Sequence, residues 1–142
     1  MGKNNSAFHV KDEIRITSCT GMGVRKDSAG IGHYGAKRGK RKHYGEDHEG
    51  VPGQDVFCPI HSGKLVRKSN PSNDPSFSGI LIEGKHISVK IFYVDPWMHL
   101  MHKKVYRGDV IGIMQDAREK YGKKMKPHVH LRINSIDPNL LK

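Results

Sequence analysis

Residues 79–94 read GILIEGKHISVKIFYV, and this stretch decides the fold class. Positions 80–82 are apolar, and from residue 86 onward apolar and polar side chains alternate with the two-residue period of a half-buried strand. Gly84 and Lys85 separate the two segments, and a glycine-containing pair between such segments is a hairpin signal. The stretch therefore predicts two antiparallel strands, at residues 79–83 and 86–94.

Further strands are expected on both sides of this hairpin. Short alternating or apolar segments occur at residues 13–18, 54–58, 63–67, 110–114 and 128–133. We expect residues 54–58 and 63–67 to pair with each other, and only residues 95–104 and 116–121 suggest helical turns. The 16 glycines and 7 prolines favour turns and short strands over long helices. The chain is thus predicted to be mainly β, with an N-terminal tail at 1–12 and a single compact antiparallel domain at 13–142, rich in loops.

Bulk composition limits the classes of protein to which the chain can belong. Its 142 residues fit one hydrophobic core, no apolar run has the length of a membrane span, and the N-terminus lacks the apolar stretch of a signal peptide. Lys and Arg number 25 against 14 Asp and Glu, so a net charge of +11 will attract polyanions. Two cysteines, Cys19 and Cys58, are too few for a disulfide scaffold, and we expect Cys58 to be a buried free thiol.

Ten histidines raise the question of a metal site, because histidine is the commonest metal ligand. His43 and Asp47 lie four residues apart, whereas His128 and His130 lie two apart on an expected strand and so face the same side. A hydrolytic zinc site needs three His or carboxylate ligands and one open position for water. His43, Asp47 and one of the second pair would bind one Zn²⁺, and the remaining histidine could take a proton from the zinc-bound water.

The order of these motifs resembles that of the lysostaphin-type zinc metallopeptidases, a family that also includes chemotaxin-like relatives. Residues 43–47 (HYGED) resemble the family's His-x-Gly-x-Asp motif, and residues 128–131 (HVHL) resemble its His-Leu-His-Phe motif. The resemblance runs from about residue 13 to residue 141. The other similar segments are residues 16–18, 23–25, 53, 56–59, 63–66, 107–112 and 136–138.

This resemblance implies a fold, a cofactor and a set of site residues. The fold would be the antiparallel β-sheet groove of the lysostaphin-type peptidases, which is similar to a duplicated hybrid motif. His43, Asp47 and His130 fall on the positions of the family's zinc ligands, and His128 falls on the position of its catalytic base. The implied substrate is a peptide cross-link of the bacterial cell wall.

Tyr93 departs from the pattern of the active members. Counting back from Gly112 without gaps places Tyr93 where those members have a histidine that helps to stabilise the oxyanion. A phenol next to a zinc can donate a hydrogen bond to an oxyanion, so Tyr93 is a candidate catalytic residue. Alternatively the site binds metal and does little chemistry, or the ring only completes a face of the sheet. A smaller departure is His48, a polar residue after Asp47, which we expect to be exposed.

These observations predict a zinc metalloendopeptidase that hydrolyses peptide cross-links of peptidoglycan. Small size, positive charge and the absence of an export signal suit a phage-type lysin, made in the cytoplasm of an infected bacterium and acting at the cell wall. There, anionic wall or outer-membrane polymers would attract it. The alternative is a catalytically weak zinc-binding module that recognises wall, glycan or receptor. Nucleic-acid binding by the basic run KRGKRK at residues 37–42 is disfavoured, because aromatic residues make up only 7% and no nucleic-acid motif occurs. The oligomeric state is left open.

Overall fold

Short antiparallel strands make up most of the structure, a computed structural model. It describes residues 12–23, 45–71, 76–118, 126–137 and 139 in full, and only the backbone of 26–27, 30–31, 37–38 and 41–42. The main strands are β5 (Gly45–Glu49), β6 (Asp55–Phe57), β7 (Ser62–Lys68), β8 (Gly79–Glu83), β9 (Ile87–Phe92), β10 (Val94–Pro96), β11 (Lys104–Tyr106), β12 (Val110–Met114) and β13 (His128–Ile136).

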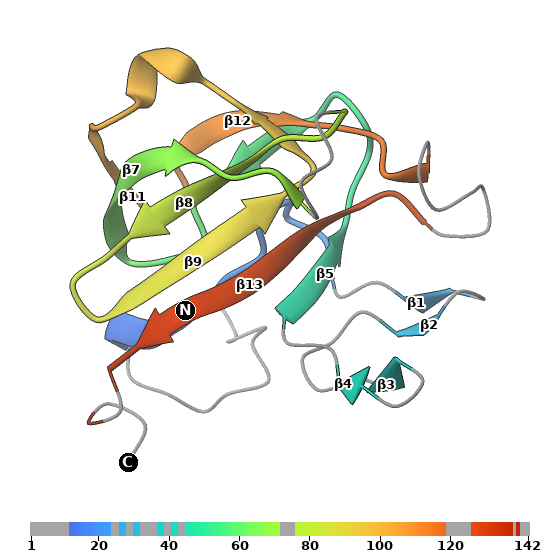
Figure 1. Cartoon of the computed structure of the whole chain (residues 1–142), viewed down its shortest axis with the longest axis horizontal. Coiled ribbons are helices and arrows are strands. Elements are labelled where there is room, and N and C mark those ends of the chain that lie inside the picture. The colour runs from blue at the N-terminus through green and yellow to red at the C-terminus, as the bar shows by residue number, and fades with distance from the viewer. Residues whose placement is uncertain are drawn as a thin grey trace.

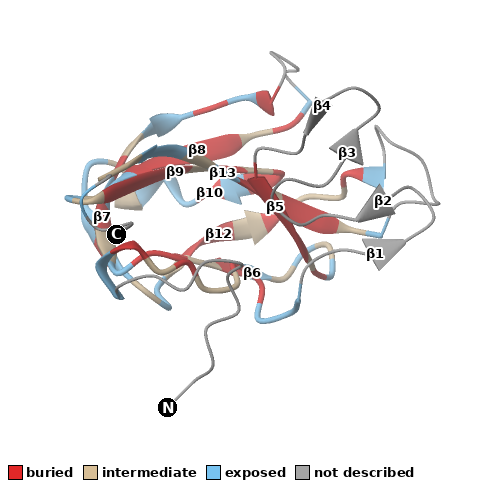
Figure 2. Ribbon diagram, turned by 90° about the horizontal axis from the view of Figure 1, so that it is seen from below, coloured by how far each residue is buried: buried red, intermediate tan, exposed pale blue. Residues whose placement is uncertain are grey.

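These strands form two sheets (Figure 1). The larger sheet has six strands in the order β11-β7-β8-β9-β13-β5, and the smaller has three in the order β10-β12-β6. Figure 2 views the same sheets after a quarter turn, with buried segments concentrated along β8, β9, β13 and β5. All described pairings are antiparallel, which confirms the predicted fold class.

Minor elements account for the rest of the described chain. Two ribbons, β1 (Lys26–Asp27) with β2 (Gly30–Ile31) and β3 (Lys37–Arg38) with β4 (Arg41–Lys42), lie near β5 in Figure 1. The 3-10 turns η1 (Asp12–Ile14) and η3 (Met98–Leu100) are the main helical elements, and η3 confirms the turn expected within residues 95–104. Residues 119–121 of the other expected turn lie outside the described residues. Across the described part of the chain, no helix has the length and apolar character needed to cross a membrane.

The hairpin expected at residues 79–94 is confirmed. β8 and β9 pair from Gly79 opposite Phe92 to Glu83 opposite Ser88, and the N–H of Gly84 donates to the carbonyl of Ile87 at 3.0 Å. The second strand ends at Phe92, earlier than expected. It ends there because the next residue, Tyr93, has a φ of 68° and turns the chain toward β10 in the smaller sheet.

Apolar side chains from both sheets meet in one core. Cys19 and Cys58 are fully buried there as free thiols, as expected for Cys58. Burial raises the pKa of the Cys58 thiol to about 11, so it remains protonated near neutral pH and unreactive. The strand residues of this core are Leu65, Ile80, Ile82, Ile87, Val89, Ile91, Val105, Val129 and Leu131 in the larger sheet, and Val56, Val94, Ile111 and Met114 in the smaller.

The expected pairing of residues 54–58 with residues 63–67 is wrong. β6 pairs with β12 in the smaller sheet, whereas β7 pairs with β8 and β11 in the larger one. The chain passes between the sheets after Phe57, where the N–H of Cys58 donates to the carbonyl of Asp109 at 2.8 Å. Because the two strands lie in different sheets, each can turn its apolar side chains into the shared core.

The strand expected at residues 13–18 is also wrong. The segment begins as the 3-10 turn Asp12–Ile14 and then continues as extended chain outside the sheets that the described residues form. Ile14 and Ile16 are nonetheless buried. The alternation in sequence therefore reports burial of one side of the segment, which does not require a strand partner.

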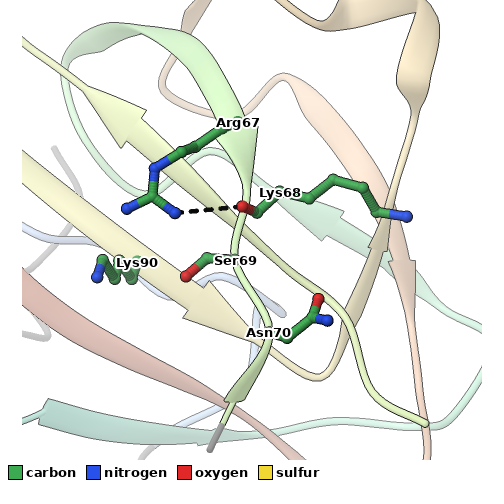
Figure 3. A pocket seen from close by; sticks show the side chains of 5 residues that line it. All are labelled: Arg67, Lys68, Ser69, Asn70 and Lys90. Atoms are coloured by element: carbon green, nitrogen blue, oxygen red, sulfur yellow. Dashed lines mark hydrogen bonds between the residues drawn. The ribbon is translucent and has the colours of Figure 1, made fainter. Parts of the chain in front are cut away.

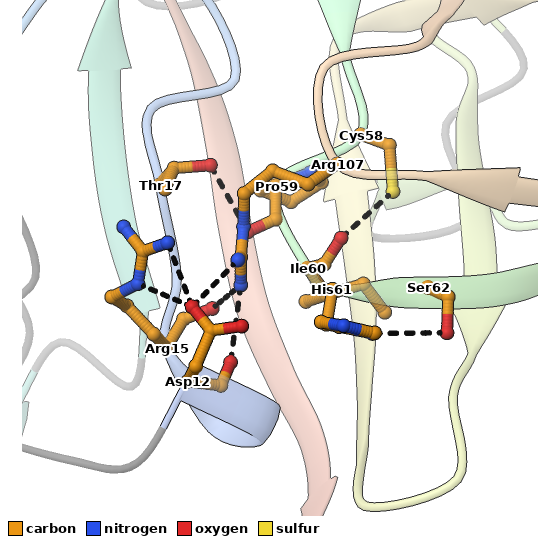
Figure 4. Close-up of polar contacts among 9 residues, drawn as sticks. All are labelled: Asp12, Arg15, Thr17, Cys58, Pro59, Ile60, His61, Ser62 and Arg107. Atoms are coloured by element: carbon orange, nitrogen blue, oxygen red, sulfur yellow. Dashed lines mark hydrogen bonds and ion pairs between the residues drawn. The ribbon is translucent and has the colours of Figure 1, made fainter. Parts of the chain in front are cut away.

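Hydrogen bonds from the Arg107 guanidinium connect the N-terminal segment, residues 12–17, to the turn before β12 (Figure 4). The guanidinium donates to the Asp12 carboxylate at 3.0 Å and to the carbonyls of Asp12 and Arg15 at 3.2 and 2.8 Å. Thr17 adds a backbone hydrogen bond to Pro59 at 2.9 Å. These bonds satisfy backbone groups that a sheet would otherwise have paired.

Candidate metal centre

Strands β5 and β13 bring one carboxylate and two imidazoles together. Asp47 lies directly opposite His130 in the register of the two strands. Its Oδ1 is 2.7 Å from His130 Nδ1, and its Oδ2 is 3.9 Å from His128 Nε2. Asp47 and His128 are each 3% exposed, so the group is largely withdrawn from water. Because His128 and His130 are two residues apart on a strand, both reach the same face, as expected.

A hydrogen bond fixes the tautomer of His128. Its Nδ1 lies 2.9 Å from the carbonyl oxygen of Lys126, which can only accept, so Nδ1 carries the proton. In the neutral imidazole the lone pair is then on Nε2, the nitrogen that faces Asp47. Lys126 is itself held by an ion pair with Glu49 at 3.3 Å. The start of β13 thus presents a basic nitrogen toward the carboxylate.

The His130 imidazole is oriented by an aromatic neighbour in the adjacent strand. Phe92 lies directly opposite His130, and the two rings stack with centroids 5.8 Å apart and planes 10° apart. The Asp47 carboxylate lies on the other side, at Nδ1. An oxygen and a nitrogen donor are thereby directed at each other, which suits the ligand preferences of zinc.

Tyr93 packs against His128 from the end of β9. It is 5% exposed, its ring meets that of His128 edge-on at 5.7 Å, and it meets Phe77 in the same way at 5.3 Å. Its N–H donates to the Ser78 carbonyl at 2.9 Å, and its carbonyl accepts from the N–H of Gln115 at 2.8 Å. These bonds hold a backbone conformation that a tyrosine seldom adopts. Tyr93 therefore belongs to a buried cluster with Phe77 and also lies against His128.

The remaining predicted ligand, His43, lies outside the described residues. Within the described residues, no three His, Cys, Asp or Glu side chains are arranged as a complete metal site. Asp47 and His130 supply two of the three donors that zinc requires, and their donor types and spacing fit. That His43 is the third zinc ligand remains a prediction from the sequence.

The expectation that His48 is exposed is wrong. It is 4% exposed, and its Nδ1 accepts a hydrogen bond from the N–H of Cys19 at 3.1 Å. The signal was present in the sequence: if Asp47 faces the site, the next residue of the same strand must face the opposite side, which here is the core. Burial lowers the pKa of the His48 imidazole to about 4.

We expect this buried imidazole to make folding stability depend on pH. Its pKa is about 4 in the folded state against 6.5 in the unfolded state, so the fold favours the neutral form. The contribution is complete above pH 6.5 and is lost as the pH falls toward 4, a loss of about 3 kcal/mol. Urea unfolding across this pH range should show the loss.

His48→Asn is the matched control, because the asparagine oxygen can accept the same N–H without titrating. Its unfolding free energy should depend on pH less steeply than that of the wild type. Equal slopes for the two proteins would show that His48 is not the group responsible.

The sequence was compared with those of known proteins. No family model matches it. Leukocyte cell-derived chemotaxin-2 of Mus musculus is 32% identical over 116 residues, which cover 79% of this chain and 74% of the relative.

Three solved structures share the fold. The solution structure of lysostaphin superimposes with a TM-score of 0.54 at 23% identity, covering 83% of this chain and 47% of that one, so the chain spans about half of its length. The catalytic domain of lysostaphin from Staphylococcus simulans gives 0.50 at 23% identity, covering 83% and 87%. The catalytic domain of the prophage-encoded M23 protein EnpA from Enterococcus faecalis, a mutant, gives 0.51 at 20% identity, covering 82% and 88%.

Proposed function

Because the chain belongs to the lysostaphin-type (M23) peptidase family, we propose that it is a zinc metalloendopeptidase that hydrolyses peptide cross-links of bacterial peptidoglycan. One observation carries the proposal. Asp47 and His130 face each other across β5 and β13, and His128 directs Nε2, the nitrogen that is not bonded to Lys126, to the same face. A carboxylate and two histidines in this relation provide both metal ligands and a base.

Asp47, His130 and His43 are the residues that would hold the zinc. Zinc, when bound, polarises the scissile carbonyl and lowers the pKa of a water molecule. The protein's part is to keep the donors in place. Phe92 fixes the plane of the His130 ring, and pairing of β13 with β5 fixes its distance from Asp47. Such support of the ligands preserves metal affinity.

His128 is the general base in this proposal. Its Nε2 takes a proton from the attacking water, while Nδ1 keeps its hydrogen bond to the Lys126 carbonyl. Nε2 then returns the proton to the leaving amine. Tyr93, whose ring lies against His128, is our candidate for a donor to the oxyanion.

A second candidate function is a zinc-binding module with little turnover. Two observations favour it: a relative at 32% identity is a chemotaxin, and Tyr93 is buried against Phe77 and His128 rather than extended into open space. If the phenol cannot reach the oxyanion, the site would bind metal and recognise a wall, glycan or receptor ligand without cutting it.

We extend the leading proposal to a phage-type lysin that acts at the cell wall. A net charge of +11 would hold such an enzyme near the anionic polymers of the wall or outer membrane. This attraction should weaken as salt is added, because salt screens exposed charges.

Release of new amino groups from purified peptidoglycan is the direct test. We expect release by the zinc-loaded protein, loss of release with a chelator, and recovery when zinc is restored. Tyr93→His should increase the release, and histidine is among the non-glycine residues that tolerate a positive φ. Stoichiometric zinc binding without cleavage of any wall preparation or glycine-rich peptide would instead establish the second candidate.

A further inference from the structure

A row of basic side chains crosses one face of the larger sheet beside the candidate metal centre. Arg67 on β7 lies opposite Leu81 on β8, Leu81 lies opposite Lys90 on β9, and Lys90 lies opposite Arg132 on β13. Directly opposed residues of neighbouring strands point to the same face. Arg67, Lys90 and Arg132, here called the cationic row, therefore share one face and span about 14 Å across four strands.

The cationic row is on the same face as the candidate ligands. Phe92, His130 and Asp47 form the neighbouring row, since each lies opposite the next. Lys90 is two residues from Phe92, and Arg132 is two residues from His130, so each pair points to the same side. Two residues of strand separate the rows by about 7 Å. A ligand that reaches the metal centre thus passes close to the row.

An open hollow of about 630 Å³ lies at the Arg67 end of the row (Figure 3). In the figure, the side chains of Arg67, Ser69 and Lys90 extend toward one another, whereas those of Lys68 and Asn70 point the other way. Leu81, which lies between the two cations in the register of the strands, is only 7% exposed, consistent with their aliphatic stems covering it. The residues that line the hollow are all polar or cationic.

The three cations have no counter-charge in the part of the chain that the structure describes. Among the described residues, none of them forms an ion pair, and the bond of Arg67 is to the carbonyl of Lys68 at 3.4 Å. Glu83 on β8 lies one step beyond the row, opposite Lys64 and Ser88. Like charges placed opposite each other weaken a sheet, so the row costs stability that an anionic ligand would offset.

We propose that the cationic row is a binding subsite for a carboxylate carried by the substrate peptide. The proposal rests on the proposed peptidase function and specifies its substrate class. Arginine matches a carboxylate with two parallel hydrogen bonds, and Lys90 adds a charge beside it. A separation of about 7 Å corresponds to two residues of extended peptide. The preferred substrate is thus an acidic peptide, with a side-chain or terminal carboxylate about two residues from the bond that is cut.

Binding of matched labelled peptides tests the subsite without using turnover. The peptides share a Gly-Gly centre and carry either Glu or Gln two residues from it, each with a free or an amidated C-terminus. Zinc-loaded His128→Ala protein should bind the Glu peptide about tenfold more tightly than the Gln peptide at low salt. The free and amidated pairs show whether a terminal carboxylate serves as well as a side chain.

Variants of the cationic row show which side chains cause the preference for the Glu peptide. Arg67→Gln, Lys90→Gln and Arg132→Gln, made in the same background, should each reduce the Glu preference severalfold, and the triple variant should abolish it. Lys85→Gln is the matched control, since Lys85 is an exposed cation in the turn at the opposite end of the β8–β9 hairpin and should leave the preference unchanged.

Equal binding of Glu and Gln peptides overturns the proposal, as does a preference that survives the triple variant. Binding of polyphosphate that depends on the row, with no peptide preference, also overturns it and assigns the row to an anionic polymer. Cleavage is a separate readout. If the wild type cleaves both peptides and binds them equally, the subsite proposal is wrong and the peptidase proposal stands. If the Glu preference depends on the cationic row but the wild type cleaves neither peptide, the peptidase proposal is wrong and the subsite proposal stands.

Discussion

His128→Ala should cut peptidoglycan about 10³-fold more slowly than the wild type while still binding zinc. General base catalysis typically contributes between about 10² and 10⁴, and the neutral His128 imidazole has its lone pair on Nε2 because Nδ1 donates to the Lys126 carbonyl. His128 is the base in our proposal and not a ligand, so its loss should spare the metal. Amino-group release at saturating zinc, together with zinc content per chain, measures both effects.

His130→Ala is the matched control for this experiment. It removes the same kind of side chain from the same strand and face, two residues away, but takes away a proposed ligand that contacts Asp47 at 2.7 Å. We therefore expect it to lose zinc and cleavage together. If His128→Ala also loses zinc, His128 is a ligand. If it keeps cleavage within about tenfold of the wild type, the base lies elsewhere.

The sequence predicted those parts of the fold that depend on local pattern. The hairpin of residues 79–94 and the shared face of His128 and His130 follow from a period of two, and both are confirmed. Local pattern does not predict which strands lie next to each other in a sheet. Alternation at residues 54–58 and 63–67 shows which side is buried but not which strand lies alongside, because any antiparallel neighbour satisfies the same pattern.

The site was harder to predict where it depends on contacts between distant residues. Asp47 and His130 are 83 positions apart; ligand chemistry groups Asp47 with either His128 or His130, and only the family resemblance selects His130. The expectation for His48 is wrong because a histidine side chain has no strong preference for the surface, whereas its position on the strand requires burial. The cationic row has no sequence signature, since its members come from three strands that the fold brings together.

Gly45→Ala should damage both the fold and the metal centre. Gly45 lies opposite Arg132 where β5 meets β13, and an added Cβ would overlap the carbonyl oxygen of Leu131 and lie 3.1 Å from His130 Cε1. The Leu131 backbone cannot easily move, because its side chain is fully buried in the core. We expect the unfolding free energy to fall by about 3 kcal/mol, a typical cost of overpacking, as measured by urea denaturation.

Zinc titration of Gly45→Ala distinguishes a general loss of stability from damage to the site. Moving β5 away from β13 would separate Asp47 from His130, so zinc affinity should fall even under conditions where the variant is fully folded. Gly23→Ala is the matched control: an added Cβ there meets nothing within 4 Å, so stability should change by less than about 0.5 kcal/mol. A less stable Gly45→Ala with unchanged zinc affinity would show that the glycine serves strand packing alone. Wild-type stability would show that the two strands can separate slightly at no cost, and the glycine of the His-x-Gly-x-Asp motif would then need another explanation.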